Sequence, residues 1–288
     1  MTSSCRNRRA ELIVIPSPDL ARLAAVHVSS LGFQTDLMVR VLEGSEVIDH
    51  PDYVTVRSPA NPEFWWGNFL LLPAAAAHGP AGPWLDRFRT EFPGAGHLAL
   101  GLDGTGVPEP DFGSFAAAGL ELVQETVLTA PGLREPPRPN RDAVIRPLAG
   151  DQDWQQAVEL QAICDAADGG PATRTFIEAR YAGRQRATEA GHGAWFGAFR
   201  DGELVAQLGI FAQPGGLARY QDVGTHPAAR RQGLAGTLVW RAGQYALGEL
   251  GARTLVILAD PAEAAIRVYR SVGLTDHETQ LSMHRAPS

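Results

Sequence analysis

The chain has 288 residues, of which 44% are hydrophobic, and this length suits two ordinary domains or one large domain with a buried core. The formal net charge of −7 argues against a broad nucleic-acid surface and favours a small cationic or neutral substrate. No apolar run approaches the ~18 residues of a membrane-spanning helix. We therefore expect a soluble cytoplasmic protein with no secretion signal, no membrane partner and no nucleic-acid partner.

The cysteines and the basic residues narrow the chemistry further. Cys5 and Cys164 lie far apart without a neighbouring His/Cys cluster, which fits a reducing compartment and predicts neither a disulfide nor a zinc site. All 25 basic residues are arginine, so no lysine can form a Schiff base or be acylated. We expect no metal.

The first half of the chain mixes helical and strand-like segments. Helices are expected over 18–31, 82–92 and 110–120, and strands over 36–44, 52–59, 63–73, 97–103 and 122–130. On the strand expected over 63–73, Trp65 and Trp66 should point to opposite faces. The proline-rich stretch over 129–143 can continue neither a helix nor a central strand, so it is interpreted as a linker.

The second half has clearer signals. A short strand over 144–148 precedes a helix for which Asp151 is a plausible cap, and a second helix lies within 172–190. Three strands follow over 193–227, separated by Asp201-Gly202 and by a turn at 214–216. A helix over about 233–250, a strand over 253–260, a helix ending near 272 and a final strand pair complete the order β-α-α-β-β-β-α-β-α-β-β.

A short sequence recurs in the two halves. "FAAAGL" (Phe115–Leu120) matches "YRSVGL" (Tyr269–Leu274) in its aromatic residue, its spacing, its glycine and its leucine. Glycine is common where helices end, so the hexamer alone could arise by chance. The parallel order of elements around it favours a degenerate duplication.

The strongest local signal is "VGTHPAARRQGLAGTLV", residues 223–239, in which a strand leads through a small polar turn into a helix. Unpaired amides and the helix dipole at such a point favour a bound anion, and a pyrophosphate is the natural guest. Arg230 and Arg231 can add charge-assisted contacts. The alternative is an ordinary strand-to-helix turn in which the glycines serve packing.

These residues resemble the GNAT superfamily of acyl-CoA-dependent N-acyltransferases. Arg230-x-x-Gly233-x-Ala235 is similar to the coenzyme loop of that family, and Ala265-x-x-x-Tyr269-x-x-x-Gly273 to its last helix. The clear resemblance covers about residues 144–285. It implies an α/β fold of the α+β kind, with tandem GNAT-like units that each have a mixed, largely antiparallel twisted sheet flanked by helices. The expected units are a degenerate domain without a coenzyme loop over 1–135 and an acetyltransferase domain over 141–288.

The resemblance also implies a site for acetyl-CoA as co-substrate. Tyr269 would protonate the leaving thiolate, and the strand before the loop would line the pantetheine while loop amides hold the pyrophosphate. The expected coenzyme-binding residues are Val223, Gly224, Thr225, Arg230, Arg231, Gln232, Gly233, Leu234, Ala235, Gly236, Thr237, Asp260 and Ala265.

Two departures from the family pattern concern the coenzyme and the base. The asparagine often found seven residues before the tyrosine is Ala262 here, so a coenzyme contact is lost unless Asp260 replaces it. The positions that often carry a base are Arg219 and Gln221. Asp222 lies between them, should face the opposite side of the strand, and is only a weak candidate base. A water chain, a residue of the first half, or no base at all are the alternatives.

The leading hypothesis is therefore an acyl-CoA-dependent N-acetyltransferase that acts on a primary amine of a small molecule by direct attack. The alternatives are a non-catalytic acyl-CoA-binding or assembly module and a protein or peptide N-acetyltransferase. The chain is expected to be a monomer with an intramolecular pseudo-dimer, or a homodimer. Neither the acceptor nor the preferred acyl chain follows from the sequence.

Overall fold

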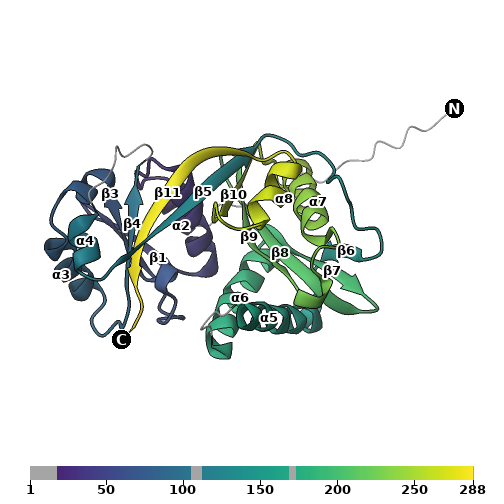
Figure 1. Ribbon diagram of the computed structural model, residues 1–288, viewed down its shortest axis with the longest axis horizontal. Coiled ribbons are helices and arrows are strands. Elements are labelled where there is room, and N and C mark those ends of the chain that lie inside the picture. Colours follow the sequence, from purple (N-terminus) through teal and green to yellow (C-terminus); the bar gives the residue numbers. More distant parts are fainter. Residues whose placement is uncertain (1–17, 105–111, 169–172, 288) are drawn as a thin grey trace.

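The computed structural model describes residues 18–104, 112–168 and 173–287. Within them, the strands form one continuous sheet of eleven strands in the order β1-β2-β3-β4-β11-β5-β10-β9-β8-β7-β6 (Figure 1). The sheet is mixed, with the pairs β3–β4 and β9–β10 parallel and the other pairs antiparallel. The predicted mixed α/β fold is confirmed.

The first half forms one end of this sheet. Its elements are α1 (Pro18–Leu23), α2 (Leu31–Glu43), β1 (Glu46–Asp49), β2 (Val54–Arg57), η1 (Trp65–Gly67), β3 (Phe69–Pro73), η2 (Ala74–His78), α3 (Gly82–Glu91), β4 (Leu98–Asp103), α4 (Gly113–Ala117) and β5 (Glu121–Ala130).

Three predictions for this half were wrong, and the first is the helix expected over 18–31, since α1 ends at Leu23. The segment expected as a strand over 36–44 belongs to helix α2, because the Ser30 side chain caps its start and Gly44, with φ of 100°, ends it in the left-handed conformation. Trp65 and Trp66 form a 3₁₀ turn, not a strand, so they do not alternate across a sheet. Both pack partly buried against a shared core.

The second half forms the other end of the sheet. Its elements are β6 (Val144–Pro147), α5 (Gly150–Ala167), α6 (Arg174–Glu189), β7 (Gly193–Arg200), β8 (Glu203–Gln213), β9 (Leu217–Thr225), η3 (Pro227–Ala229), α7 (Leu234–Gly248), β10 (Thr254–Ala259), α8 (Ala265–Ser271) and β11 (Thr275–Arg285). The predicted order holds up to the end of α8, but the expected final strand pair is the single strand β11. Asp151 lies in the first turn of α5 and is not its cap.

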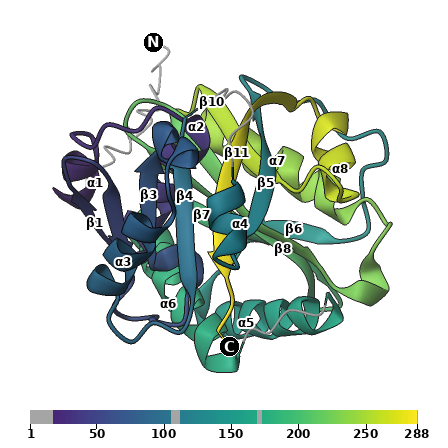
Figure 2. The same ribbon diagram turned by 60° about the vertical axis from the view of Figure 1, so that its left-hand side comes forward.

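The two halves exchange their last strands. β5 and β11 pair with each other along most of their length, while β5 also pairs with β10 and β11 also pairs with β4. Figure 2 shows β11 lying between β4 and β5. The expected units 1–135 and 141–288 are therefore not separate sheets. β11 of the second unit pairs with β4 of the first, and β5 of the first unit pairs with β10 of the second.

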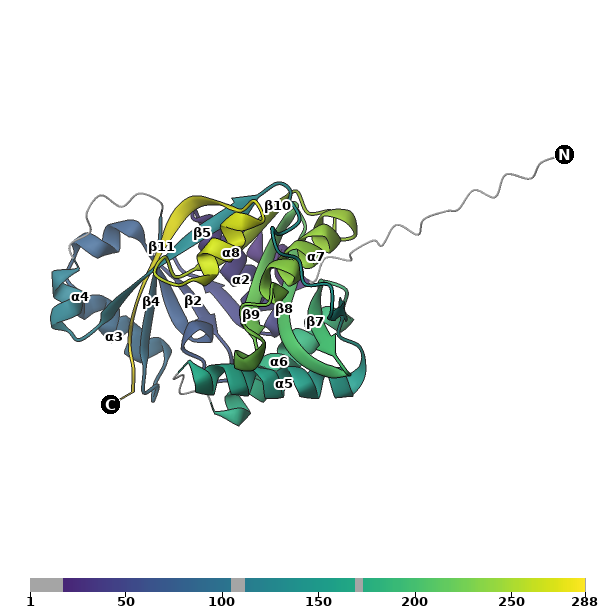
Figure 3. The same ribbon diagram turned by 45° about the vertical axis from the view of Figure 1, so that its right-hand side comes forward.

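Helices cover both faces of the sheet. In the second half, α7 and α8 lie on one face, and α5 and α6 on the other (Figure 3). The core under α5 and α6 continues into the first half, since Trp154, Tyr181 and Trp195 share one cluster with Phe33 and Leu37 of α2. Among the described residues, no helix has the length and apolarity needed to cross a bilayer.

Candidate active site

The central cavity lies where β9 and β10 separate. These parallel strands pair only from Leu217–Thr254 to Arg219–Val256, and they diverge beyond that point. β9 also carries a β-bulge facing β8, and Asp222 in it has φ of 40°. The cavity at this place has a volume of about 950 Å³. It is lined by β9, the loop before α7, the start of α7, α8, and parts of α5, α6 and the linker.

The loop before α7 presents a row of free backbone donors. None of the amides of residues 231–236 donates a hydrogen bond to another described residue. Arg231 and Gly233 adopt left-handed conformations, with φ of 63° and 78°. Such alternation turns successive amides toward one concave surface, and the dipole of α7 adds to its attraction for an anion. This arrangement suits an anion such as a pyrophosphate.

The linker lies across this loop, which sequence reasoning missed. The Asn140 amide donates to Thr237 Oγ1 at 2.8 Å, and Asn140 Nδ2 donates to the Gln232 carbonyl at 2.8 Å. A Cβ atom on Gly233 would lie 2.2 Å from the Arg138 carbonyl oxygen. Pro136, Pro137 and Arg138 line the cavity. The proline and arginine content of 129–143, which indicates a linker, did not reveal that it forms a wall of the site.

The two loop arginines have different surroundings. Arg230 pairs with both oxygens of Asp168 at 3.0 Å and also donates to the Thr225 carbonyl. Arg231 lines the cavity and forms no ion pair with any described residue. Arg231 is therefore the freer of the two to meet a phosphate.

Tyr269 lies in the cavity wall on α8. Its side chain is buried, and its hydroxyl forms no hydrogen bond with any described residue. Burial, with the charges of Glu263 and Asp222 adding, raises the pKa of Tyr269 well above its ordinary value. The phenol therefore keeps its proton at neutral pH and can donate it.

Most of the predicted site residues meet at this cavity. The predicted residues that line it are Asp222, Val223, Gly224, Thr225, Arg230, Arg231, Gly233, Leu234, Ala235, Gly236, Ala265 and Tyr269. The side chains of three others have different partners: Gln232 accepts from Arg200, Thr237 Oγ1 donates to the Gly233 carbonyl, and Asp260 accepts from the Ala262 amide. The structure does not bring Asp260 to the cavity wall.

Asp222 requires a correction. The bulge turns the Asp222 side chain onto the face of the sheet that α6 covers. Arg219 contacts α2 on this same face. The expected opposite orientation of Asp222 and Arg219 is therefore wrong. Arg184 Nη2 donates to Asp222 Oδ2 at 2.7 Å, and Arg180 lies 3.4 Å away. Burial acts against ionisation, but the two arginines outweigh it and hold the pKa of Asp222 well below its usual range. A carboxylate held in this way is a poor proton acceptor, which argues against Asp222 as the base.

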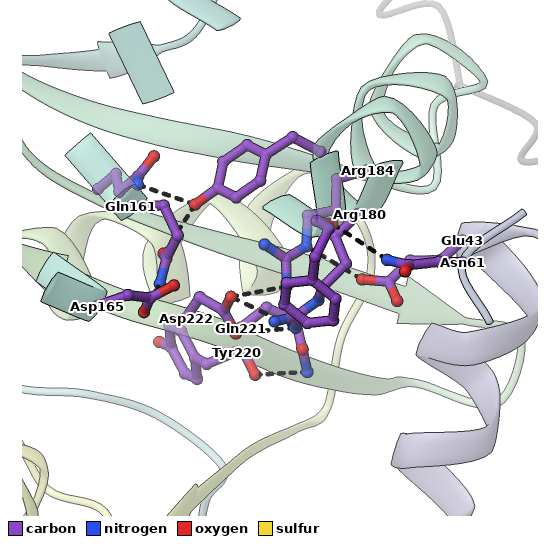
Figure 4. Close-up of polar contacts among 12 residues, drawn as sticks. Glu43, Asn61, Gln161, Asp165, Arg180, Arg184, Tyr220, Gln221 and Asp222 are labelled. Atoms are coloured by element: carbon purple, nitrogen blue, oxygen red, sulfur yellow. Dashed lines mark hydrogen bonds and ion pairs between the residues drawn. The ribbon is translucent and has the colours of Figure 1, made fainter. Parts of the chain in front are cut away.

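The Asp222 contacts continue into the first half (Figure 4). Arg184 is fully buried and its Nε also donates to Glu43 Oε1 of α2 at 3.1 Å. Glu43 in turn pairs with Arg40. The first half therefore contributes to the charged groups directly behind the cavity.

Sequence reasoning also missed the wall formed by α5 and α6. Gln161, Cys164 and Asp165 of α5, Asp168 directly after it, and Arg180 of α6 line the cavity. Their spacing of three to four residues along α5 is the one signal in the sequence, since it places them on one helix face. That signal is weak, because a polar helix face is usually solvated.

Comparisons with known proteins agree with this geometry. Residues 155–274 match the family model described as the acetyltransferase (GNAT) family. No curated protein gives a significant match over the chain.

Three solved structures share the fold over most of the chain. A GCN5-related N-acetyltransferase from Kribbella flavida is 20% identical with a TM-score of 0.60, covering 94% of this chain and 96% of its own. A GCN5-related N-acetyltransferase from Sphaerobacter thermophilus is 16% identical with a TM-score of 0.57, covering 93% and 92%. A conserved protein of unknown function from Staphylococcus epidermidis is 12% identical with a TM-score of 0.63, covering 85% and 95%.

Residues 155–274 thus resemble a GNAT acetyltransferase domain, and the solved structures share the fold of the chain. The matched residues include the loop before α7, helix α8 and most of the cavity lining, whereas the linker residues Pro136, Pro137 and Arg138 lie outside the match.

Proposed function

We propose that this protein transfers the acetyl group of acetyl-CoA to a primary amine of a small molecule. The row of free amides over 231–236, which opens on the same cavity as Tyr269, carries this proposal. The loop would hold the pyrophosphate, and the diverging strands β9 and β10 would take the pantetheine and thioester between them. The cavity volume of about 950 Å³ is ample for the thioester arm and a small acceptor.

The reaction follows from these groups. An uncharged amine attacks the thioester carbon, a C–N bond forms, and the C–S bond breaks. The departing sulfur takes a proton from the Tyr269 hydroxyl, which is protonated at neutral pH. The proton that the nitrogen loses restores the hydroxyl through solvent.

The proposal also covers the acceptor, the oligomeric state and the cellular compartment. The acceptor is a small molecule, the chain acts as a monomer in which the two halves form a pseudo-dimer, and it acts in the cytoplasm. The exchange of β5 and β11 supports the pseudo-dimer, because each half already has its partner within the same chain.

A second candidate is a non-catalytic acyl-CoA-binding module. One observation favours it. Asp222, the carboxylate in the β9 bulge, pairs with Arg180 and Arg184 and is therefore a poor base. An uncharged amine does not require such a base, so this observation does not remove the enzyme from consideration.

Calorimetric titration with acetyl-CoA, followed by a thiol-release assay over a panel of small amines, separates the two candidates. The enzyme should bind the coenzyme and release thiol with at least one class of amine. Tight coenzyme binding without turnover on any class would favour the binding module, and failure to bind acetyl-CoA would contradict both.

A further inference from the structure

The cavity wall opposite α8 carries a guanidinium whose charge is only weakly compensated. Arg180 lies in this wall on α6, and its shortest contact with a carboxylate is 3.4 Å, to Asp222. Arg184 makes the shorter contact of 2.7 Å with the same oxygen. The Arg180 Nε is buried and has no hydrogen-bond partner.

The ion pairs behind this wall are shared unevenly. Among the described residues, the ion pairs of Arg40, Arg180 and Arg184 involve two carboxylates, Glu43 and Asp222. Arg40 and Arg184 each have a close partner in Glu43, and Arg184 has a second in Asp222. Arg180 is therefore the most weakly paired of the three arginines, and it is the one of the three that lines the cavity.

Aromatic packing fixes the position of this guanidinium. Its carbon lies 4.6 Å from the ring centroid of Phe64, which comes from the first half, and 5.7 Å from that of Phe176. Ring faces attract the cation but occupy none of its N–H groups. Arg180 Nη2 makes a long hydrogen bond of 3.5 Å to Asp222 Oδ1, and Nη1 donates to no described residue, so these two nitrogens are the donors that a ligand in the cavity can engage.

A carboxylate without a cation lies near Arg180. Asp165 of α5 accepts a hydrogen bond from Gln161 Nε2 at 2.7 Å and forms no ion pair with any described residue. Figure 4 shows Gln161 and Asp165 on one side of Asp222, with Arg180 and Arg184 between Asp222 and Glu43. The cavity wall thus has one weakly compensated positive group and one unpaired negative group.

We infer that the acceptor is an amino acid or a similar zwitterion, whose carboxylate binds Arg180 and whose amino group approaches Asp165. A planar guanidinium edge with free donors matches a carboxylate in a bidentate contact. A phosphate dianion fits less well, because Asp165 and Asp222 lie close by and would repel it. The inference deepens the proposed acetyl transfer and depends on it.

The test compares acceptors that share an amine and differ only in the carboxylate. Thiol release from acetyl-CoA is measured with a panel of free amino acids and with the amide of each one. We expect at least one amino acid to exceed its amide about tenfold or more in kcat/KM, because an unpaired buried donor discriminates strongly against a ligand that lacks its partner.

Variants at Arg180 test whether this residue causes the preference for the acid over the amide. In Arg180→Gln, the ratio of acid to amide in kcat/KM should fall toward one, because the acid loses its carboxylate partner and the amide does not. Arg180→Lys keeps the charge without the planar fork, so it should retain an intermediate ratio and serves as the folded comparison if the glutamine variant is unstable. Arg174→Gln, at an exposed site on the same helix, is the matched control.

The outcomes separate this inference from the proposed function. Equal use of acids and amides, or a preference for acids that survives in both Arg180 variants, would overturn the role of Arg180 while leaving acetyl transfer intact. An equal loss of activity toward acid and amide in the variants would also overturn it, since that is the signature of a merely structural role. Coenzyme binding with no acceptor of any class would instead count against acetyl transfer itself.

Discussion

At the scale of single residues, Tyr269 has a comparison within its own chain. Phe115 of helix α4 lies at the corresponding place and is fully buried, so an aromatic ring alone satisfies the packing there. What distinguishes Tyr269 is its hydroxyl, which lies in the half that also has the free amides.

Replacing Tyr269 by phenylalanine should therefore spare binding and impair chemistry. We expect coenzyme affinity to be nearly unchanged and kcat to fall by about 10²–10⁴-fold, the usual contribution of a positioned acid. Steady-state kinetics and a binding titration measure the two effects. Tyr245→Phe, on α7 and outside the cavity wall, is the control, and unchanged turnover in Tyr269→Phe would remove the tyrosine from the mechanism.

Glu125 gives a prediction about pH. It lies on β5 opposite Gln280 of β11, and burial, with the charge of Asp36 adding and that of Arg219 opposing, raises its pKa from 4.5 to about 7. The folded protein therefore holds this proton up to a higher pH than the unfolded chain does. Because the folded state binds the proton more tightly, this group lowers the free energy of unfolding as pH rises from 4.5 toward about 7.

The variant Glu125→Gln removes this penalty. Its melting temperature should exceed that of the unmodified protein by about 2–4 °C at pH 8, and the difference should shrink at pH 5. Thermal unfolding followed by circular dichroism at both values measures it. Glu121→Gln, at the exposed end of the same strand, is the control. A difference of equal size at both pH values would show that Glu125 acts by packing instead of by charge.

At the scale of elements, the start of α7 depends on close contact with the linker. Gly233 combines a φ of 78° with a carbonyl oxygen that lies 2.2 Å from where a Cβ would be. A side chain there would strain the backbone and push the linker off the loop.

Gly233→Ala should weaken both stability and coenzyme binding. We expect a loss of stability of about 1–2 kcal/mol from the left-handed conformation alone, and a further loss of coenzyme affinity as the amides move. Gly248→Ala, at the other end of the same helix, has no atom within 4 Å of its new Cβ and should be neutral or slightly stabilising. Equal effects of the two substitutions in melting and titration experiments would contradict the role assigned to Gly233.

At the scale of the whole molecule, strand exchange should make the two halves unfold together. Removing β11 from the first half would leave β4 and β5 without the strand that joins them. The core under α5 and α6 also includes residues of both halves.

Differential scanning calorimetry should therefore record one transition, with equal calorimetric and van't Hoff enthalpies. Residues 1–135 produced alone should not reach a stable fold, because they lack β11. Two separate transitions, or a folded first half on its own, would contradict the coupling.

The sequence was sufficient for the features that depend on near neighbours in the chain. Turns at Asp201-Gly202 and 214–216, the loop over 230–236 and the helix that bears Tyr269 all have local chemical signals, and the order of these signals along the chain is enough to indicate the family. The second part of helix α2 was predicted as a strand because its apolar residues are dense enough to fit both the helical and the strand periodicity.

Only the tertiary structure decided what depends on contacts between distant segments. The linker on the α7 loop, the exchange of β5 and β11, and the ion pairs that join Glu43, Arg184 and Asp222 each connect segments far apart in the chain. The bulge that turns Asp222 and the weak compensation of Arg180 likewise follow from which groups meet in space. The sequence determined the loop before α7 because its chemistry is local to one turn, whereas the cavity wall of α5 and α6 is held by contacts with the first half, and no local pattern specifies those contacts.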